Sequence, residues 1–568
     1  MEYAIYGINR VSKDFMYIFN NLSIACCLED FPDKEMWNGI IVKDVEQFIK
    51  EKEHIQIIIC DFEHTSKEKR LEKLGLKYGI DYLYEEDFFS QLDGVTFNPD
   101  NKPIYVWGTG IRSQKLEAWA EEISYNIGIQ GYIDSYKGGN GDFYHNLPIY
   151  SPEEINYKEV YVVVAVARYA VIEDRLKDEG LMEYRDYCIS TDYMSRPSVM
   201  LRQTIFDRSC YDFECKTMLN HAEILNDGDM ICCCSTFISN TLGRISKDVT
   251  PQNLWESNVH RIMALSNVNR TYSFCKKQMC PLFIGRNSNG KVAIEKPYDV
   301  IKNSPSTVAL GYDTTCNLFC ITCRDKICVE KGKRLEEKLK LSDRINQDII
   351  SACEFLILAG DGEVFLSRAY EKIYTSAAIK QIKYLRLLSN GMLFNEDKWI
   401  KVRKHTDAKI MLTISIDAAT KESYESIRRG GNFEVLQRNM EYAASLRKRG
   451  ELSYIRFNFV VQKMNYKEMP QFVEWGLRLG VDEVFFTKIL NWGTYTEEEF
   501  KKISMMEEDG ITPKPELEEV LNNPIMSNPI VDLGTIRSHH DKYNVEVIDN
   551  YYRWELERKV KGLFIDGN

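Results

Sequence analysis

Short apolar runs alternate with amphipathic stretches throughout the N-terminal part of the chain. Runs of about four to eight apolar residues bounded by turn residues are typical of strands, whereas apolar positions three or four apart are typical of helices. The strands predicted here are 3–7, 23–27 and 54–61, and the predicted helices are 12–20 and 67–74. This alternation predicts a Rossmann-like α/β domain over residues 1–97.

A second Rossmann-like domain is predicted over residues 98–200, with strands at 103–107, 130–134 and 161–167. Its first strand leads into a turn containing Gly108 and Gly110, and Asp134 ends the next strand. This is part of a dinucleotide-binding fingerprint, with Ser113 in place of the third glycine. The alternative is a docking or substrate-presenting module, and the two domains are candidates for a diverged tandem pair.

The same alternation continues in the C-terminal half with a regular spacing of buried strands. The predicted strands are 308–312, 354–359, 384–388, 410–416, 454–461 and 483–488. Six strands separated by helical stretches predict a partial (β/α)6 TIM-like barrel over residues 301–495, followed by a C-terminal extension at 496–568. In such barrels the functional groups lie at the carboxyl ends of the strands.

Composition and net charge argue against some classes of function. A chain of 568 residues needs several domains, and 44% hydrophobic with 28% charged residues is ordinary for a globular protein. The net charge of −12 argues against nucleic-acid binding, which needs clustered Lys and Arg. No apolar run approaches the roughly 20 residues of a membrane span, and no signal-peptide pattern is visible, so a cytoplasmic location is expected.

Cysteine is the unusual component. Ten of the 16 cysteines lie between Cys210 and Cys323, and none follows Cys353. In a large chain without an export signal, such cysteines more often bind metal or carry out chemistry than form disulfides.

Three cysteines, Cys316, Cys320 and Cys323, have C-x3-C-x2-C spacing directly after the first barrel strand. Three thiolates can hold three irons of a 4Fe–4S cluster and leave the fourth iron open to a small chelating ligand. The alternatives are a structural zinc loop with Cys328 as its fourth ligand, or three buried cysteines without a metal.

With this loop and the barrel motifs behind it, the chain resembles the radical S-adenosylmethionine (SAM) superfamily, in particular the branch with SPASM or twitch auxiliary-cluster domains. The resemblance implies that the three cysteines bind a catalytic 4Fe–4S cluster. It also implies that SAM is cleaved reductively to a 5′-deoxyadenosyl radical, which abstracts hydrogen from a substrate carbon. Thr322 departs from the family pattern, which usually has an aromatic residue before the third cysteine.

The resemblance assigns SAM contacts to motifs at the strand ends. The predicted contacts are Gly360, Asp361, Gly362, Glu363, Ser389, Asn390, Ser415, Asp417, Arg428 and Gln462. The first four would receive the SAM ammonium, Arg428 or its neighbour Arg429 the carboxylate, and Gln462 the ribose or adenine. The alternatives are an ordinary strand-to-helix turn and a surface ion pair.

A second metal site is predicted upstream of the barrel, in a SPASM/twitch-like domain over residues 205–300. Relatives of this branch usually carry these cysteines downstream. The proposed ligands are Cys215, Cys233, Cys275 and Cys280. Cys232 or Cys234 could replace Cys233, and Cys210 could replace Cys215. Four thiolates would saturate a second 4Fe–4S cluster, and a four-cysteine zinc site is the alternative.

Two substrate classes fit these features. The first is a sugar, polyol or glycan precursor that an oxidoreductase or epimerase oxidises or epimerises. The second is a ribosomal peptide modified by a peptide maturase. The N-terminal α/β domains and the lack of a recognisable peptide-binding winged helix favour the first. A flavodoxin- or ferredoxin-like electron donor is the expected partner, and a degenerate, purely binding relative is the remaining alternative.

Overall fold

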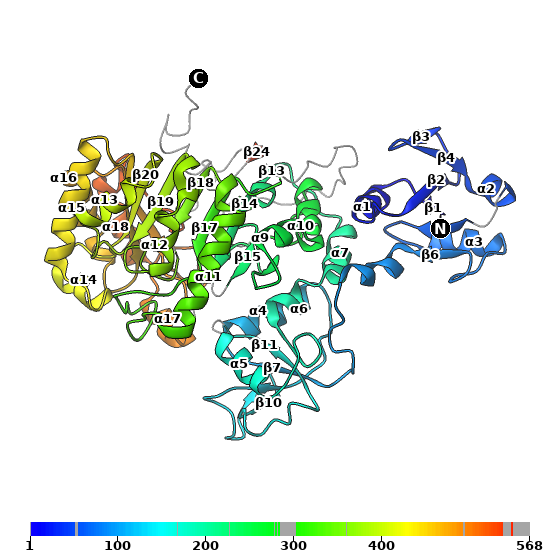
Figure 1. The fold of residues 1–568 in the computed structure, drawn as a ribbon, viewed down its shortest axis with the longest axis horizontal. Helices are drawn as coiled ribbons and strands as arrows, with labels where there is room; N and C mark the ends of the chain where they lie inside the picture. Colours follow the sequence, from blue (N-terminus) through cyan, green and yellow to red (C-terminus); the bar gives the residue numbers. More distant parts are fainter. Residues whose placement is uncertain are drawn as a thin grey trace.

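The computed structural model describes residues 2–51, 55–166, 169–225, 228–277, 279–280, 282–283, 303–358, 360–491, 495–537 and 547–548. Two small α/β domains and one large sheet make up these residues. Figure 1 shows the first α/β domain at one end of the molecule and the barrel strands at the other, with the second α/β domain beside the middle.

The first domain has a six-stranded sheet in the order β3-β4-β2-β1-β5-β6. Its elements are β1 (Glu2–Tyr6), α1 (Arg10–Ile18), β2 (Ser23–Glu29), β3 (Met36–Trp37), β4 (Ile40–Asp44), α2 (Val45–Glu51), β5 (Gln56–Ile59), α3 (Thr65–Lys73), β6 (Tyr82–Tyr84) and the 3-10 helix η1 (Glu85–Leu92). The central strands are apolar and buried, as parallel strands covered on both faces require.

The second domain repeats this topology, with the strand order β12-β11-β7-β8-β10-β9. Its elements are β7 (Ile104–Trp107), α4 (Ile111–Glu122), β8 (Ile129–Ile133), β9 (Phe143–Tyr144), β10 (Leu147–Tyr150), β11 (Tyr161–Val164), α5 (Ala170–Asp178), β12 (Tyr187–Ile189) and α6 (Ser190–Met194). The first turns also match, because Ser12 Oγ donates to Gly7 O at 2.7 Å and Ser113 Oγ donates to Gly108 O at 2.6 Å. Both observations support the interpretation of a tandem pair.

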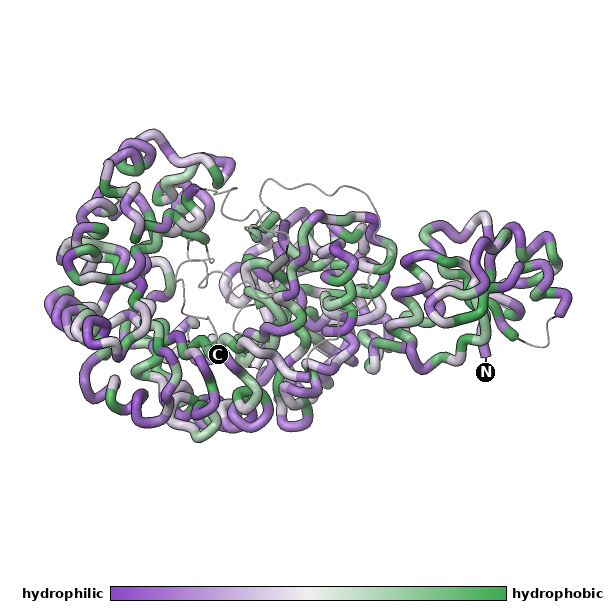
Figure 2. Tube along the Cα trace, turned by 90° about the horizontal axis from the view of Figure 1, so that it is seen from above, coloured by the Kyte–Doolittle hydropathy of each residue, from purple (hydrophilic) through white to green (hydrophobic). Residues whose placement is uncertain are grey.

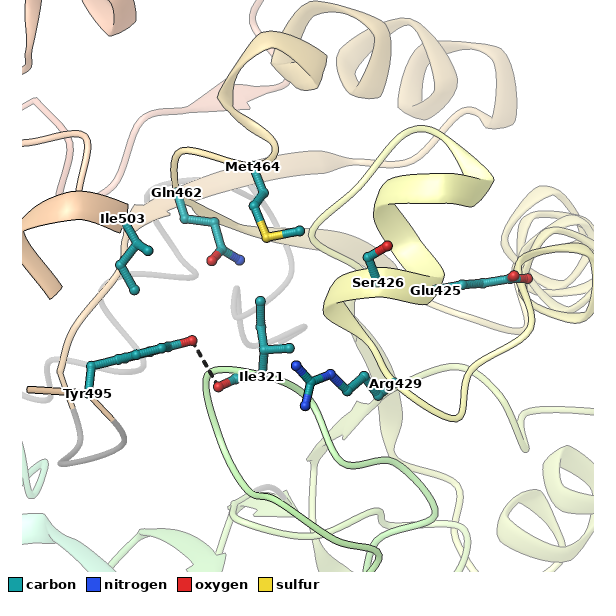
Figure 3. Close-up of a pocket in the computed structure, with 8 residues that line it drawn as sticks. All are labelled: Ile321, Glu425, Ser426, Arg429, Gln462, Met464, Tyr495 and Ile503. Atoms are coloured by element: carbon teal, nitrogen blue, oxygen red, sulfur yellow. Dashed lines mark hydrogen bonds between the residues drawn. The ribbon is translucent and has the colours of Figure 1, made fainter. Parts of the chain in front are cut away.

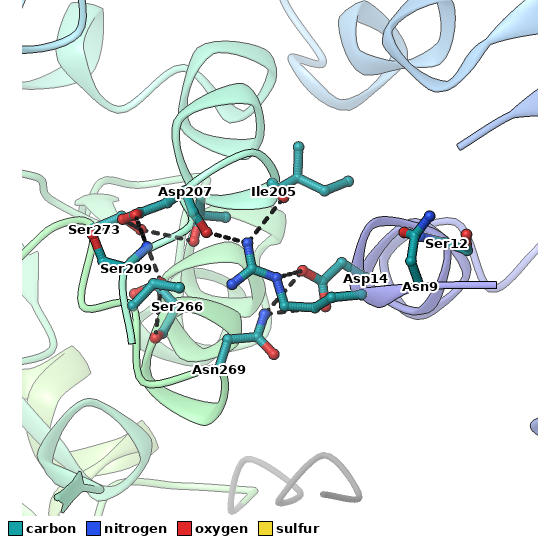
Figure 4. Close-up of polar contacts among 12 residues, drawn as sticks. Asn9, Ser12, Asp14, Ile205, Asp207, Ser209, Ser266, Asn269 and Ser273 are labelled. Atoms are coloured by element: carbon teal, nitrogen blue, oxygen red, sulfur yellow. Dashed lines mark hydrogen bonds and ion pairs between the residues drawn. The ribbon is translucent and has the colours of Figure 1, made fainter. Parts of the chain in front are cut away.

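A buried polar contact fixes the first domain to the middle of the chain (Figure 4). Arg10 on α1 lies 3.6 Å from Asp14 and donates to the carbonyl oxygens of Ile205 and Asp207. Asn269 Nδ2 donates to both carboxylate oxygens of Asp14, at 3.1 and 2.9 Å. Arg10 is 1% exposed and Asp14 is fully buried, so the charges balance each other away from water.

Helices and short strands of the middle region connect the α/β domains to the barrel. They are α7 (Pro197–Ile205), β13 (Glu214–Cys215), α8 (Thr217–Asn220), α9 (Pro251–Trp255) and α10 (Asn258–Val268), and β13 pairs with β24 (Val547–Ile548). Proline at the first turn of α7 and α9, and Ser257 capping α10, start these helices where the sequence pattern changes.

The large sheet has ten strands in the order β16-β15-β14-β17-β18-β19-β20-β21-β22-β23. They are β14 (His221–Leu225), β15 (Asp229–Ile231), β16 (Gly243–Arg244), β17 (Thr307–Gly311), β18 (Phe355–Leu358), β19 (Tyr384–Ser389), β20 (Lys409–Ser415), β21 (Tyr454–Val461), β22 (Glu483–Lys488) and β23 (Val531–Asp532). All pairs from β14 through β23 are parallel. Strands β17 to β22 are the six predicted barrel strands, so the predicted partial barrel is confirmed. Its sheet is open in the described residues.

Helices cover the outer face of this sheet. They are α11 (Gly332–Asp348), α12 (Arg368–Tyr374), α13 (Glu396–Arg403), α14 (Lys421–Ile427), α15 (Phe433–Lys448), α16 (Met469–Leu479), α17 (Glu497–Ile503) and α18 (Pro515–Leu521), with 3-10 helices η2 (Ile350–Ala352), η3 (Ala377–Gln381), η4 (Tyr466–Glu468) and η5 (Pro524–Ser527). Outward residues such as Leu310 and Leu356 join one large core with helix residues such as Ile345. Viewed from above, the barrel forms a curved wall (Figure 2).

Strands β14 to β16 belong to the region predicted as a separate auxiliary domain, yet they continue the barrel sheet. The apolar pattern of 221–231 allowed a strand, but pattern alone does not state which sheet a strand joins. Residues 284–302 of that region, and most of the C-terminal extension after 537, lie outside the described residues.

Candidate active site at the carboxyl end of the barrel

The three-cysteine loop lies between β17 and α11, at the carboxyl end of the barrel strands. Backbone bonds tie it to the segment after α14: Phe319 N donates to Arg429 O at 3.0 Å, and Ile321 N donates to Ile427 O at 3.1 Å. Buried Asp313 fixes the start of the loop, because its carboxylate accepts from Thr315 N at 2.8 Å and from a side chain on the next loop, Ser367 Oγ, at 2.6 Å. This role of Asp313 was not predicted from the sequence.

Each of the three sulfur atoms has its own hydrogen-bond donor. Asn390 Nδ2 lies 3.8 Å from Cys316 Sγ, and Arg428 Nη1 lies 3.6 Å from Cys320 Sγ. Arg324 Nε lies 3.3 Å from Cys323 Sγ. Two of the three donors are cationic, and positive donors favour thiolate over thiol.

The sulfur environment therefore fits the thiolate ligands of an iron–sulfur cluster. Burial raises the pKa of Cys316 and of Cys320, and the charge of Arg428 opposes this effect at Cys320. Cys328 lies beside the loop through a backbone bond, since Cys316 N donates to Cys328 O at 2.7 Å. Its sulfur faces Thr314, at 3.4 Å from Oγ1.

The glycine motif after β18 packs tightly against the cysteine loop. Gly360 has φ +153°, and a Cβ built there would lie 2.3 Å from Gly311 Cα. A Cβ at Gly362 would lie 2.4 Å from Asp313 O. Both positions accept only glycine without rearrangement. Asp361 O accepts a hydrogen bond from Arg324, which links the motif to Cys323.

Glu363 connects this motif to the turn after β19. Its carboxylate is fully buried and accepts from Ser389 Oγ at 2.8 Å, Asn390 N at 2.7 Å and Phe365 N at 3.1 Å. Burial raises the pKa of Glu363, and these donors oppose that shift. The structure thus brings together three of the predicted contact motifs: the glycine motif, Ser389 and Asn390.

Asp417 and Arg428 form a buried ion pair on the other side of the cysteine loop. Arg428 Nη2 lies 2.5 Å from Asp417 Oδ2, and Val460 N donates to Asp417 Oδ1 at 2.8 Å. Asp417 has φ +67°, a strained value that these bonds hold in place. Arg428 thus connects Asp417 to Cys320, whereas Ser415 lies half-buried at the end of β20.

A cavity of about 620 Å³ opens beside the cysteine loop (Figure 3). It is lined by Ile321, Glu425, Ser426, Arg429, Gln462, Met464, Tyr495 and Ile503. Gln462 is 1% exposed, and neither Nε2 nor Oε1 has a protein partner in the described residues. A buried amide with both atoms unsatisfied costs free energy unless a ligand or water meets it, so Gln462 fits a polar ligand in this cavity.

Tyr495 and Arg429 line this cavity, and only Arg429 was predicted from the sequence, as the alternative to Arg428. Tyr495 donates its hydroxyl to Ile321 O at 2.8 Å and so braces the cysteine loop from the segment after β22. Arg429, rather than Arg428, lines the cavity. The consecutive pair Arg428-Arg429 was a signal for an anion contact, but sequence does not state which of two neighbours faces inward.

The four predicted auxiliary cysteines also converge. Cys215, Cys275 and Cys280 pack in one small aromatic cluster with Tyr272. Burial raises the pKa of Cys233 well above its usual range, and repulsion from the other three cysteines and Cys234 adds to the shift. Cys232 contacts Met263 in the core, with 3.8 Å between the sulfur atoms.

Two features are absent from the described residues. No three His, Cys, Asp or Glu side chains there are arranged to hold a single metal ion. None of the helices there is long and apolar enough to cross a bilayer.

The chain is similar to known proteins over part of its length. No model of a known protein family matches the chain. Probable GTP 3′,8-cyclases of Methanococcus maripaludis strains C5 and C6 are 26% and 27% identical over 176 residues, which are 30% of this chain and 55% of each relative. The chain therefore spans about half the length of these curated relatives.

Solved structures with partial similarity include Streptococcus suis SuiB bound to its precursor peptide SuiA, with 15% identity, 35% of this chain and 42% of that chain covered, and a TM-score of 0.28. Another is anSMEcpe with bound AdoMet, with 19% identity, 33% and 50% covered, and a TM-score of 0.26.

A three-cysteine loop lies at the carboxyl end of an open parallel α/β barrel, and each of its sulfur atoms has a hydrogen-bond donor. Together with the partial sequence similarity to the cyclases, this loop supports the resemblance of the barrel to the radical SAM superfamily. This resemblance implies a 4Fe–4S cluster and SAM as cofactors. The SPASM/twitch branch stays a prediction.

Proposed function

We propose that this chain is a radical SAM enzyme that uses Cys316, Cys320 and Cys323 to hold a 4Fe–4S cluster. The single observation that carries the proposal is the set of three sulfur atoms with separate donors beside the Glu363 motif. When bound, the cluster and SAM supply a 5′-deoxyadenosyl radical that removes hydrogen from an unactivated substrate carbon.

The residues of the chain then have separate tasks. Arg324 and Arg428 neutralise thiolate charge, and Glu363 holds the turn after β19 in the shape that presents Asn390 to Cys316. Gln462 and Arg429 face the cavity, where an amide and a guanidinium suit the polar and anionic parts of SAM. Ser415 ends β20 and Asp417 follows it, and both are proposed to contribute to the same SAM site.

The second cysteine group is proposed to hold another 4Fe–4S cluster. The convergence of Cys215, Cys233, Cys275 and Cys280 supports this, and four thiolates leave no site for SAM. For the substrate we favour a sugar, polyol or glycan precursor, which is oxidised or epimerised, because two Rossmann-like domains precede the barrel. A flavodoxin- or ferredoxin-like protein would deliver the electron.

Anaerobic reconstitution with iron and sulfide, followed by SAM and dithionite, tests the proposal. The wild-type protein should form 5′-deoxyadenosine, and the triple variant Cys316→Ala, Cys320→Ala, Cys323→Ala should form none. Cys328→Ala is the matched control, since its sulfur faces Thr314. Loss of activity in that control would favour a four-cysteine site, and deoxyadenosine from the triple variant would refute the cluster assignment.

A further inference from the structure

Cys323 is the most exposed cysteine of the three-cysteine loop. Its side chain reaches the surface, whereas Cys320 is buried and Cys316 is half-buried. Arg324 fixes this position, because its Nε lies 3.3 Å from Cys323 Sγ and its Nη1 donates to Thr314 O at 2.6 Å. A protein that delivers an electron must bring its own redox group close to the cluster, so we expect it to dock beside Cys323.

The segment that follows the third cysteine turns back along the start of the loop. Cys316 and Cys328 form an antiparallel bridge, in which Cys316 N donates to Cys328 O at 2.7 Å. The sulfur of Cys328 faces Thr314, at 3.4 Å from Oγ1. Successive side chains of extended backbone point to opposite faces, so Ile327 and Val329 point away from the loop. Accordingly, Ile327 is 52% exposed and Val329 is 44% exposed.

Positive charge gathers in the same segment. Residues 324–334 contain five cations and two carboxylates, in a chain whose net charge is −12. One of the carboxylates, Glu330, has a side chain that is only 8% exposed and lies 3.2 Å from Arg334 Nε. The other, Asp325, is exposed. A locally positive surface attracts an acidic protein, whereas the net charge of the whole chain repels one, so the segment is where such a partner is steered.

Lysines flank the two apolar side chains of this segment. Lys326 directly precedes Ile327, and Lys331 follows Val329 by two residues. All four side chains are exposed, and together they are called the docking patch below. An apolar centre with a charged rim is the usual arrangement of a protein–protein interface. The small size of the patch fits a transient electron-transfer complex, since such complexes bury little surface.

We propose that the docking patch binds a small acidic electron-carrier protein, which is oxidised by one electron as the cluster is reduced by one. This inference rests on the proposed function, because a carrier is needed only where a cluster is bound. It adds where the partner binds and which charge it presents. The redox group of the carrier faces Cys323, and carboxylates around that group face Lys326 and Lys331.

Biolayer interferometry of the full-length protein with an acidic flavodoxin and with an acidic ferredoxin tests this. The wild-type protein should bind at least one of the two carriers. Raising the salt from about 50 to about 300 mM should weaken that binding several-fold, because salt screens the attraction between exposed charges. Lys326→Glu together with Lys331→Glu should weaken it at least about tenfold, since like charges then face each other. Ile327→Ser should weaken it about fivefold through lost apolar contact.

Lys69→Glu together with Lys448→Glu is the matched control, because it changes the net charge equally at exposed lysines on α3 and α15. Three results would overturn the inference: no binding of either carrier to the wild-type protein, equal losses in the two double variants, or a wild-type dimer that Ile327→Ser dissociates. The dimer would show that a second copy of the chain covers the patch. Deoxyadenosine formation with dithionite reports separately on the proposed function. Its absence beside carrier binding that the patch variant abolishes would reject the enzyme and retain the docking patch.

Discussion

Replacing Arg428 by alanine should destabilise the barrel strongly, whereas replacing its neighbour Arg429 should not. Arg428 lies 2.5 Å from Asp417, whose side chain is only 2% exposed. Removing one partner of a buried ion pair leaves an uncompensated charge and costs about 3–5 kcal/mol. Arg429 faces the cavity, and Arg429→Ala should change the free energy of unfolding by no more than about 0.5 kcal/mol.

The loss of stability in Arg428→Ala should be larger at high pH than at low pH. Burial raises the pKa of Asp417 above its ordinary value even with Arg428 present. Without the cation, the native state binds a proton at a higher pH than the unfolded chain, whose Asp has a pKa of about 3.9. The loss in Arg428→Ala is therefore fully present above the raised native pKa and shrinks as pH falls toward the unfolded value.

Differential scanning calorimetry of the unloaded protein at pH 8 and pH 5 measures this. A loss of 3–5 kcal/mol corresponds to a fall in the barrel transition on the order of 10 °C. The double variant Arg428→Ala, Asp417→Asn should lose less than Arg428→Ala alone, because no unpaired charge remains. Equal losses for Arg428→Ala and Arg429→Ala, or a loss that is the same at both pH values, would refute the reasoning.

Three further outcomes are expected. Reconstituted wild-type protein should carry about eight irons per chain. The double variant Cys275→Ala, Cys280→Ala should carry about four and still form deoxyadenosine. About four irons together with zinc in the wild-type protein would reject the second cluster. Glu363→Gln should lower the free energy of unfolding by about 1–3 kcal/mol, because an amide N–H₂ then meets the donors Ser389 Oγ and Asn390 N. Calorimetric titration should also show weaker SAM binding to this variant. An unchanged affinity for SAM would contradict the proposed role of Glu363. Gly360→Ala should lower the melting temperature far more than Gly450→Ala, which has open space at its Cβ and costs about 1–2 kcal/mol; similar shifts would show that the close contact with Gly311 is relieved cheaply.

The barrel could be predicted from the sequence because its strands are long apolar runs with turn residues between them. The predicted strands 454–461 and 483–488 coincide with β21 and β22, and the other four differ by a residue or so at their ends. The hairpins β3-β4 and β9-β10 were missed, because one strand of each hairpin has only two residues and so leaves no periodic pattern.

The site was predicted in its parts rather than in its connections. Glycine and cysteine spacing identified the loop and the motif after β18, since local chemistry demands those residue types. The pairing of Arg428 with Asp417 and the bracing of Ile321 by Tyr495 depend on contacts between distant segments. The place of β14 in the barrel sheet depends on its pairing with β17, and the sequence of one strand does not contain that information.

The buried contact of Arg10 and Asp14 with Asn269 holds the first α/β domain in a fixed position against the middle region of the chain. A domain that moves between two sites must break its contacts at a low cost in free energy. Separating the Arg10–Asp14 contact would expose two buried charges and three of their hydrogen-bonding partners at once. The first α/β domain therefore acts as a fixed support rather than as a carrier that moves toward the barrel.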